Sequence, residues 1–150
     1  MAIYSAPFDA LAVTTATDLF HVTVTDTIVI HSLVLGNTTD LGDAAEEVLC
    51  IGVFRAVTGG SGGTALTEAS YVRGDDPAVT AAVLANNSSI STGGTRIGLI
   101  PWNIRIPLEK IWTPETRIRI DSGEDPLAFR LMAAPTDSVT MCGELLWEEL

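Results

Sequence analysis

Short runs in which apolar and polar residues alternate recur along this chain about every ten residues, and clusters of Gly, Pro, Asn, Asp and Ser separate them. Alternation with a period of two is typical of β-strands that bury one face, and the clusters are typical of turns. No long stretch has the period of an amphipathic helix. The sequence therefore predicts an all-β fold, an antiparallel β-sandwich or barrel. The clearest runs are Ile28 to Leu35, Val48 to Val57, Arg117 to Asp121, Leu127 to Ala133 and Val139 to Trp147.

The order of the expected strands predicts several local arrangements. Ile3 to Phe8 is the first strand, and Asp18 to Thr25 pairs with Thr27 to Leu35 in a hairpin around Asp26. Glu47 to Val57 is apolar on both faces, which predicts a central strand covered on both sides. The later strands are expected at Arg96 to Pro101, Asn103 to Ile106, Thr116 to Asp121, Leu127 to Ala133 and Val139 to Leu146.

A long irregular excursion, at about residues 58–95, interrupts this pattern. It opens with Thr58 to Thr64, a Gly- and Ser-rich stretch that predicts a flexible loop. The one regular element expected inside it is a short helix over Pro77 to Ala85, with Pro in its first turn. At 150 residues the chain, 1–150, is expected to form a single domain with its own core.

Apolar residues make up 47% of the chain, and its mean hydropathy is +0.33. No uninterrupted apolar stretch reaches the roughly 18 residues that a membrane span requires, so we expect no membrane partner. We interpret the apolar excess as surface that is buried against other copies of the chain. The opening Met1 to Pro7 has neither the basic nor the apolar region of a secretion signal. Cys50 and Cys142 are too few for a disulfide scaffold, which favours free thiols and synthesis in a reducing cytoplasm.

The chain is strongly acidic, with 19 Asp and Glu against 8 Lys and Arg and a net charge of −11, which disfavours nucleic acid as a partner. The charges are also unevenly distributed, because no Lys or Arg precedes Arg55. Two interpretations fit this pattern. Either neighbouring subunits meet through acidic and basic faces, or the surface is solvated and its ion pairs form within the chain. The basic residues of the later segment are Arg96, Arg105, Lys110, Arg117 and Arg119.

The patterns that would indicate catalysis or cofactor binding are all incomplete. Gly60 to Ala65 fits G-x-G-x-x-A, but a dinucleotide site needs a helix to follow within a βαβ unit. A phosphate loop would lack its lysine, because the only lysine is Lys110. His21 and His31 are two potential metal ligands without a third, and no Ser lies in a G-x-S-x-G turn. We therefore expect no enzyme activity, no cofactor, and no catalytic, cofactor-binding or metal-binding residues.

The three tryptophans divide into two groups. Trp147 shares a strand face with Val139, Met141 and Leu145, which predicts a position in the core. Trp102 and Trp112 lie in basic surroundings that are interrupted by proline. Such residues serve either as interface anchors or as packing beneath loops, and both interpretations fit.

A further set of short motifs covers nearly the whole chain: Tyr4-Ser5-x-x-Phe8, Asp18-Leu19-Phe20, Leu35-Gly36, Asp40-x-Gly42-Asp43-Ala44-x-Glu46-Glu47, Arg55 before the Gly-rich loop, Ala133-Ala134-Pro135, Met141-x-Gly143 and Glu148-Glu149. Together they resemble the capsid decoration, or cement, proteins of tailed bacteriophages. The resemblance implies a jelly-roll-like sandwich, made in the bacterial host cytoplasm, that sits on the outer capsid surface of the virion as a homo-oligomer, expected to be a trimer. Its partner would be the major capsid protein, whose neighbouring subunits it clamps. No site residues carry over, because the family has no catalytic motif.

Two segments are candidate clamps on the shell: the Gly-rich Thr58 to Ser70 and the uncharged Ala2 to Phe8. Two other functional classes are compatible with the same residues. A phage tail or fibre component, or a receptor-binding module, would use the sandwich to display loops. A lectin-type carbohydrate-binding jelly roll, or an enzyme on that fold, would need a cluster of polar side chains around a pocket.

Overall fold

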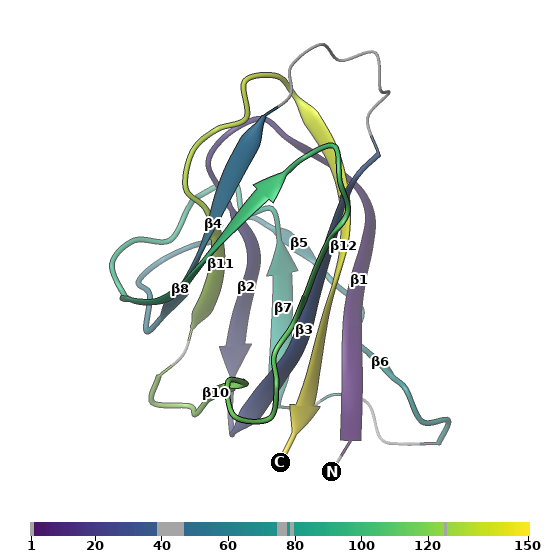
Figure 1. Cartoon of the computed structure of the whole chain (residues 1–150). Helices are drawn as coiled ribbons and strands as arrows, with labels where there is room; N and C mark the ends of the chain where they lie inside the picture. Colours follow the sequence, from purple (N-terminus) through teal and green to yellow (C-terminus); the bar gives the residue numbers. More distant parts are fainter. Residues whose placement is uncertain (1, 39–46, 75–77, 79, 125) are drawn as a thin grey trace.

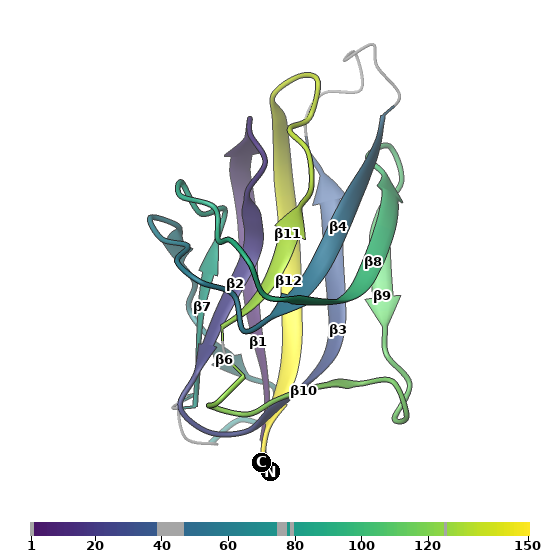
Figure 2. The same ribbon diagram turned by 90° about the vertical axis from the view of Figure 1, so that its left-hand side faces the viewer.

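The computed structural model of the chain describes residues 2–38, 47–74, 78, 80–124 and 126–150. These residues form two six-stranded sheets and no helix. All strand pairs are antiparallel, and the two sheets face each other as layers (Figures 1 and 2). The predicted antiparallel β-sandwich is therefore confirmed. None of the described residues belongs to a helix long and apolar enough to cross a bilayer.

One layer, the β12 sheet, contains both ends of the chain. Its first and last strands pair from Ala2↔Glu149 to Val13↔Val139, so the termini lie together at one end of the sandwich (Figure 2). Two strands, β9 and β10, pair with different parts of β3 and form one edge of the sheet. The order is β10 (Ile118–Ile120), β3 (Ile28–Asn37), β12 (Val139–Glu149), β1 (Ala2–Val13) and β6 (Ala69–Ser70), with β9 (Leu108–Ile111) also on β3.

The other layer, the β11 sheet, has one long central strand on each side of β11. Its two ends differ, because one is the two-residue β5 and the other is the nine-residue β8. The order is β5 (Thr64–Ala65), β7 (Ala81–Ala85), β2 (Asp18–Val24), β11 (Leu127–Leu131), β4 (Val48–Arg55) and β8 (Thr95–Asn103).

The first four strands of the chain alternate between the layers. β1 and β3 belong to the β12 sheet, whereas β2 and β4 belong to the β11 sheet. The predicted hairpin around Asp26 is therefore wrong, since β2 and β3 do not pair. The physical reason is that both strands bury apolar side chains, so facing each other across the core covers more apolar surface than lying side by side. The Asp26 carboxylate accepts a 2.8 Å hydrogen bond from the backbone N–H of Thr27 at this crossing.

The core fills the space between the two layers. Phe20 and Phe129 are fully buried, with ring centroids 6.3 Å apart, and Phe8 packs 5.4 Å from Phe20. Trp147 is also fully buried, so its predicted core position is confirmed. Burying a side chain such as Phe129 stabilises the fold by about 2–3 kcal/mol. These contacts, rather than local propensity, fix the two sheets against each other.

The excursion at 58–95 is more regular than the sequence predicts. It contains β5, β6 and β7, and β7 pairs with β2 from Phe20↔Ala85 to Val24↔Ala81. The predicted helix over Pro77 to Ala85 is therefore wrong where Ala81–Ala85 is described, and 75–77 and 79 lie outside the described residues. A strand forms because alternate side chains (Ala81, Val83 and Ala85) can enter the core beside β2. The Gly-rich loop also makes bridges, Thr58↔Thr92 and Ser61↔Ser89.

Two further expectations need correction, the strand over Asn103 to Ile106 and the candidate clamp over Ala2 to Phe8. The chain turns after Asn103, because Asn103 accepts hydrogen bonds from the backbone N–H groups of Arg105 and Ile106, so Asn103 to Ile106 is not a strand. The segment from Ala2 to Phe8 is not a free clamp, since β1 lies between β12 and β6 and contributes buried side chains to the core.

The strand predicted over Glu47 to Val57 is β4, and it lies inside its sheet between β11 and β8. Its inner side chains Leu49, Ile51 and Val53 are buried, as expected. The cover on its outer face is partial: Phe54 is buried, whereas Val48 is 63% exposed.

Candidate functional site

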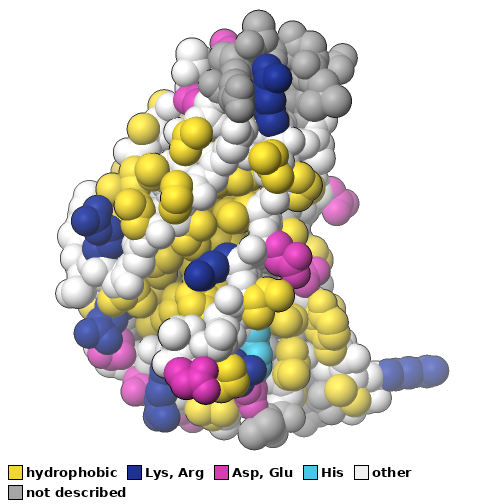
Figure 3. Space-filling view, viewed as in Figure 1, with side chains coloured by type: hydrophobic (Ala, Val, Ile, Leu, Met, Phe, Trp, Pro, Cys, Tyr) yellow, Lys and Arg dark blue, Asp and Glu magenta, His cyan; other side chains and the backbone are white. Residues whose placement is uncertain are grey.

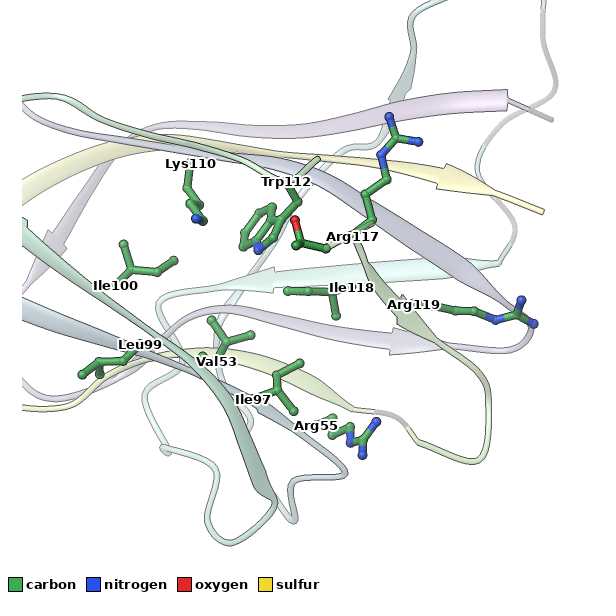
Figure 4. A pocket seen from close by; sticks show the side chains of 12 residues that line it. Val53, Arg55, Ile97, Leu99, Ile100, Lys110, Trp112, Arg117, Ile118 and Arg119 are labelled. Carbon is green, nitrogen blue, oxygen red and sulfur yellow. The ribbon is translucent and has the colours of Figure 1, made fainter. Parts of the chain in front are cut away.

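A groove opens at the edge of the sandwich where β8 of one sheet faces β9 and β10 of the other. It has a volume of about 400 Å³. We call it the edge groove, and Figure 4 shows the side chains around it. Its lining residues are Val53, Arg55, Ile97, Gly98, Leu99, Ile100, Lys110, Trp112, Thr116, Arg117, Ile118 and Arg119. The groove exists because the terminal strands of the two sheets do not pair with each other, which leaves this side of the core open.

The wall of the edge groove is apolar and reaches from the core to the surface. Ile100 and Trp112 are buried, whereas Ile97 and Leu99 of β8 are 42% and 51% exposed. In Figure 4 Lys110, Trp112 and Ile118 point across the groove toward β8. Figure 3 shows hydrophobic side chains gathered over the middle of this face, with Lys and Arg side chains among and around them. Contiguous exposed apolar surface of this kind is typical of a binding site.

The groove is also cationic, although the protein as a whole is acidic. Four of the eight Lys and Arg residues line it (Arg55, Lys110, Arg117 and Arg119), and none of its lining residues is Asp or Glu. Two of these charges have partners close by: Arg55 Nη1 lies 3.3 Å from Glu124 Oε1, and Arg119 Nε lies 3.2 Å from Asp121 Oδ1.

The other two cations make no ion pair with any carboxylate in the described part of the chain. Lys110 Nζ lies 5.9 Å from the centroid of the Trp112 ring, a weak cation–π contact. Arg117 Nε is buried and has no hydrogen-bond acceptor among the described residues. Arg117 acts at longer range on Glu115, whose pKa is lowered first by a hydrogen bond to its own backbone, then by Thr113, and in smaller part by the Arg117 charge. Lys110, which points into the groove in Figure 4, is therefore available to an external anion.

The sequence identified part of this site. Lys110, Arg117, Arg119 and Trp112 all belong to the basic, tryptophan-containing segment, for which contact with a neighbouring subunit was one of two interpretations. Arg96 and Arg105, from the same segment, are not among the lining residues. Arg55 was missed as a groove residue because it comes from β4, far away in the sequence. Ile97 and Leu99 were missed because an apolar run in a strand predicts burial, and here the strand lies at an open edge.

A second polar cluster lies on the outer face of the β11 sheet, and its side chains are largely buried. The Asp18 carboxylate is fully buried and accepts hydrogen bonds from the backbone and hydroxyl of Ser91, both 2.8 Å long, and from Asn87 Nδ2, 3.1 Å long. Arg130 Nε lies 3.5 Å from Asp18 Oδ1, and its guanidinium covers the Phe54 ring at 4.2 Å. We call Asp18, Asn87, Ser91 and Arg130 the latch cluster, because it ties the excursion to β2 and β11.

The structure does not bring the two histidines together. His21 belongs to the β11 sheet, and its Nε2 lies 3.2 Å from the carbonyl oxygen of Gly59. His31 and Glu148 both belong to the β12 sheet, and His31 Nε2 lies 3.1 Å from Glu148 Oε2. No group of three His, Cys, Asp or Glu residues that could hold a metal ion occurs among the described residues. Cys50 and Cys142 are free thiols, as expected.

The remaining sequence motifs have structural explanations. Gly60 to Ala65 ends in strand β5, which is Thr64–Ala65, and does not open a helix, so the context of a dinucleotide site is missing. Trp102 is buried and donates a 2.6 Å hydrogen bond to the carbonyl oxygen of Ile106, which agrees with packing beneath a turn.

Comparison of the chain with protein-family models, with curated proteins and with solved structures finds no match. The resemblance to phage decoration proteins therefore stays a prediction.

Proposed function

We propose that this chain is a structural virion protein, a decoration protein that binds the outer surface of a tailed-phage head through its edge groove. The observation that carries the proposal is the groove itself: exposed apolar side chains, and two cations without an ion pair among the described residues, gathered at one edge of an otherwise acidic sandwich. A surface of this composition gains free energy by covering a partner's apolar and acidic groups.

The strand order supports a jelly-roll form of the sandwich. The pairs are nested, because β1 pairs with β12, β2 with β11, β3 with β9 and β10, and β4 with β8. A chain paired in this way resembles one long hairpin wrapped into two sheets, as in the jelly rolls of viral capsid proteins. The fold alone does not specify a function, so the proposal depends on the groove and on the sequence resemblance.

The chemistry of the polar groups favours binding over catalysis. The buried polar side chains of the latch cluster hydrogen-bond to one another, and the Asp18 carboxylate alone accepts three such bonds. A decoration protein needs no reactive group, since binding only to the assembled shell stabilises that state by mass action. The net charge of −11 suits an outer surface better than the DNA-filled interior.

The test of this role is the stoichiometry of the protein in purified particles, measured by mass spectrometry. We expect hundreds of copies per particle, removed by the variant Lys110→Glu and retained by Arg73→Glu. Arg73 is an exposed cation that does not line the groove, so it is a control with the same charge change. A handful of copies would contradict decoration and favour a tail or fibre component. Equal attachment of both variants would contradict the role of the groove.

The proposed assembly is a homotrimer. Light scattering of the purified protein should then give about three times the 15.8 kDa mass of one chain. A mass of one chain, both free and after release from particles, would contradict this part of the proposal.

A further inference from the structure

We propose that the edge groove binds an extended acidic segment of the partner, in which apolar side chains alternate with carboxylates, as a strand added along β8. This proposal rests on the proposed function, because it gives the chemistry of the partner at the same attachment surface. It follows from three independent features of the groove: a free strand edge, an apolar wall and unpaired positive charge.

The backbone of β8 supplies the free strand edge. β8 is the last strand of its sheet and pairs only with β4 among the described residues. An unprotected strand edge pairs readily with another extended chain, and proteins usually guard such edges with Pro or with charges. In β8 these guards are at the two ends, Arg96 and Pro101, whereas Ile97 to Ile100 has neither. We therefore expect the added strand to align with Ile97 to Ile100.

The apolar wall determines the pattern of the added strand. Ile97 and Leu99 border the groove on one side, and Trp112 and Ile118 border it on the other (Figure 4). Successive side chains of a strand point to opposite faces, so a bound strand presents every second side chain beside Ile97 and Leu99 and the others toward Lys110. The residues beside Ile97 and Leu99 should therefore be apolar.

The charge determines the remaining positions. Lys110 points into the groove, and neither Lys110 nor Arg117 has an ion pair within the described part of the chain. A carboxylate next to Lys110, flanked by apolar surface, is less screened than one in open water. Within the described residues, a second copy of this chain offers no such strand at the other free ends of its sheets, because these are β5 and β6, each two residues long and without a carboxylate.

The test uses a fluorescein-labelled peptide of about eight residues that alternates Glu and Val, with fluorescence anisotropy as the readout. We expect saturable binding of the Glu–Val peptide. The affinity should fall by about tenfold or more when Lys replaces each Glu of the peptide. Lys110→Glu and Leu99→Asp should each weaken binding about tenfold. The controls Arg73→Glu and Val72→Asp make the same changes in charge at exposed positions outside the groove. Their affinities for the peptide should stay within about twofold of that of the unmodified protein. Circular dichroism shows whether each variant is folded.

Three results would overturn this proposal: no saturable binding of the Glu–Val peptide, equal binding of the Lys–Val peptide, or equal loss in the control variants. Tighter binding of a thymidine oligonucleotide would also overturn it, in favour of nucleic acid. The two proposals can fail separately. If Lys110→Glu removes the protein from particles but the peptide does not bind, the groove attaches by other chemistry. If the peptide binds but particles lack the protein, the decoration role is wrong.

Discussion

Replacing Asp18 by Ala should destabilise the protein more than any single substitution of a surface ion pair. The Asp18 carboxylate is fully buried, and it accepts three hydrogen bonds from Asn87 and Ser91 besides lying 3.5 Å from Arg130 Nε. The substitution leaves the Arg130 guanidinium, whose side chain is only 12% exposed, without its counter-charge. It also removes the acceptor of the buried Ser91 backbone N–H.

The expected cost follows from these two losses. Removing one partner of a buried ion pair costs about 3–5 kcal/mol, and an orphaned buried donor costs about 1–3 kcal/mol. The two losses share one site and do not add, so we expect the free energy of unfolding to fall by about 3–5 kcal/mol. That is a large part of the roughly 5–15 kcal/mol by which domains are stable. The double variant Asp18→Ala, Arg130→Leu should regain part of the loss, because it removes the uncompensated charge.

Urea unfolding followed by tryptophan fluorescence measures this effect, because Trp102, Trp112 and Trp147 are all buried. The matched control is Glu124→Ala, which breaks the Arg55–Glu124 pair at the surface, where both side chains are 42% exposed. That pair should contribute less than about 1 kcal/mol. If Asp18→Ala and Glu124→Ala lower the free energy of unfolding equally, the reasoning about the latch cluster is wrong.

Three further predictions concern single features of the fold. Gly143→Ala should lower the free energy of unfolding by about 1–3 kcal/mol, because its added methyl group would lie 2.8 Å from the carbonyl oxygen of Val34. The control Gly123→Ala meets no atom within 4 Å and should change the free energy of unfolding little. Equal losses in the two variants would contradict this reasoning. The Tyr71 hydroxyl should ionise above pH 10.0, because its hydrogen bond to Glu144, its partial burial and the Glu144 charge raise its pKa. The contribution of the neutral Tyr71 hydroxyl to stability is then complete below pH 10.0 and is lost as the pH rises through the raised pKa. Absorbance titration in a Tyr4→Phe background should show that Glu144→Gln lowers the pKa of Tyr71 toward 10.0. An unchanged pKa would contradict the role of Glu144. Deleting residues 2–7 should abolish cooperative thermal unfolding, since it removes much of β1, and a retained transition would restore that segment as a candidate clamp.

The strands were predictable from the sequence where one face of a run is strictly apolar. The predicted Leu127 to Ala133 and Val139 to Leu146 correspond to β11 and β12, with ends that differ by a few residues. The sheet to which a strand belongs was not predictable in the same way. A period of two indicates a buried face, but β2 and β3 have the same signature whether they pair or face each other across the core. The helix prediction for Pro77 to Ala85 was wrong for a related reason. A run of Ala and Val is compatible with either a helix or a strand, and here the free edge of β2 provides a neighbour with which a strand can pair.

The edge groove and the latch cluster were harder to predict, because both depend on contacts between distant residues. Asp18 and Ser91 are 73 positions apart, and neither residue type signals a buried partner. Arg55 joins Lys110 and Arg117 only because β4 and β8 lie at the same side of the sandwich. The basic segment was visible in the sequence, but its position beside an apolar opening depends on which strand terminates the sheet.

Hydrogen–deuterium exchange of the protein, free and bound to purified particles, tests most directly whether the edge groove is the attachment surface. We expect the backbone amides of Ile97 to Ile100 to exchange more slowly on the particle, because an added strand or a covering partner protects the free edge of β8. The exposed turn at Tyr71 to Gly74 is the reference and should exchange at the same rate in both states. Unchanged exchange in β8, with protection elsewhere on the sandwich, would contradict attachment through the edge groove.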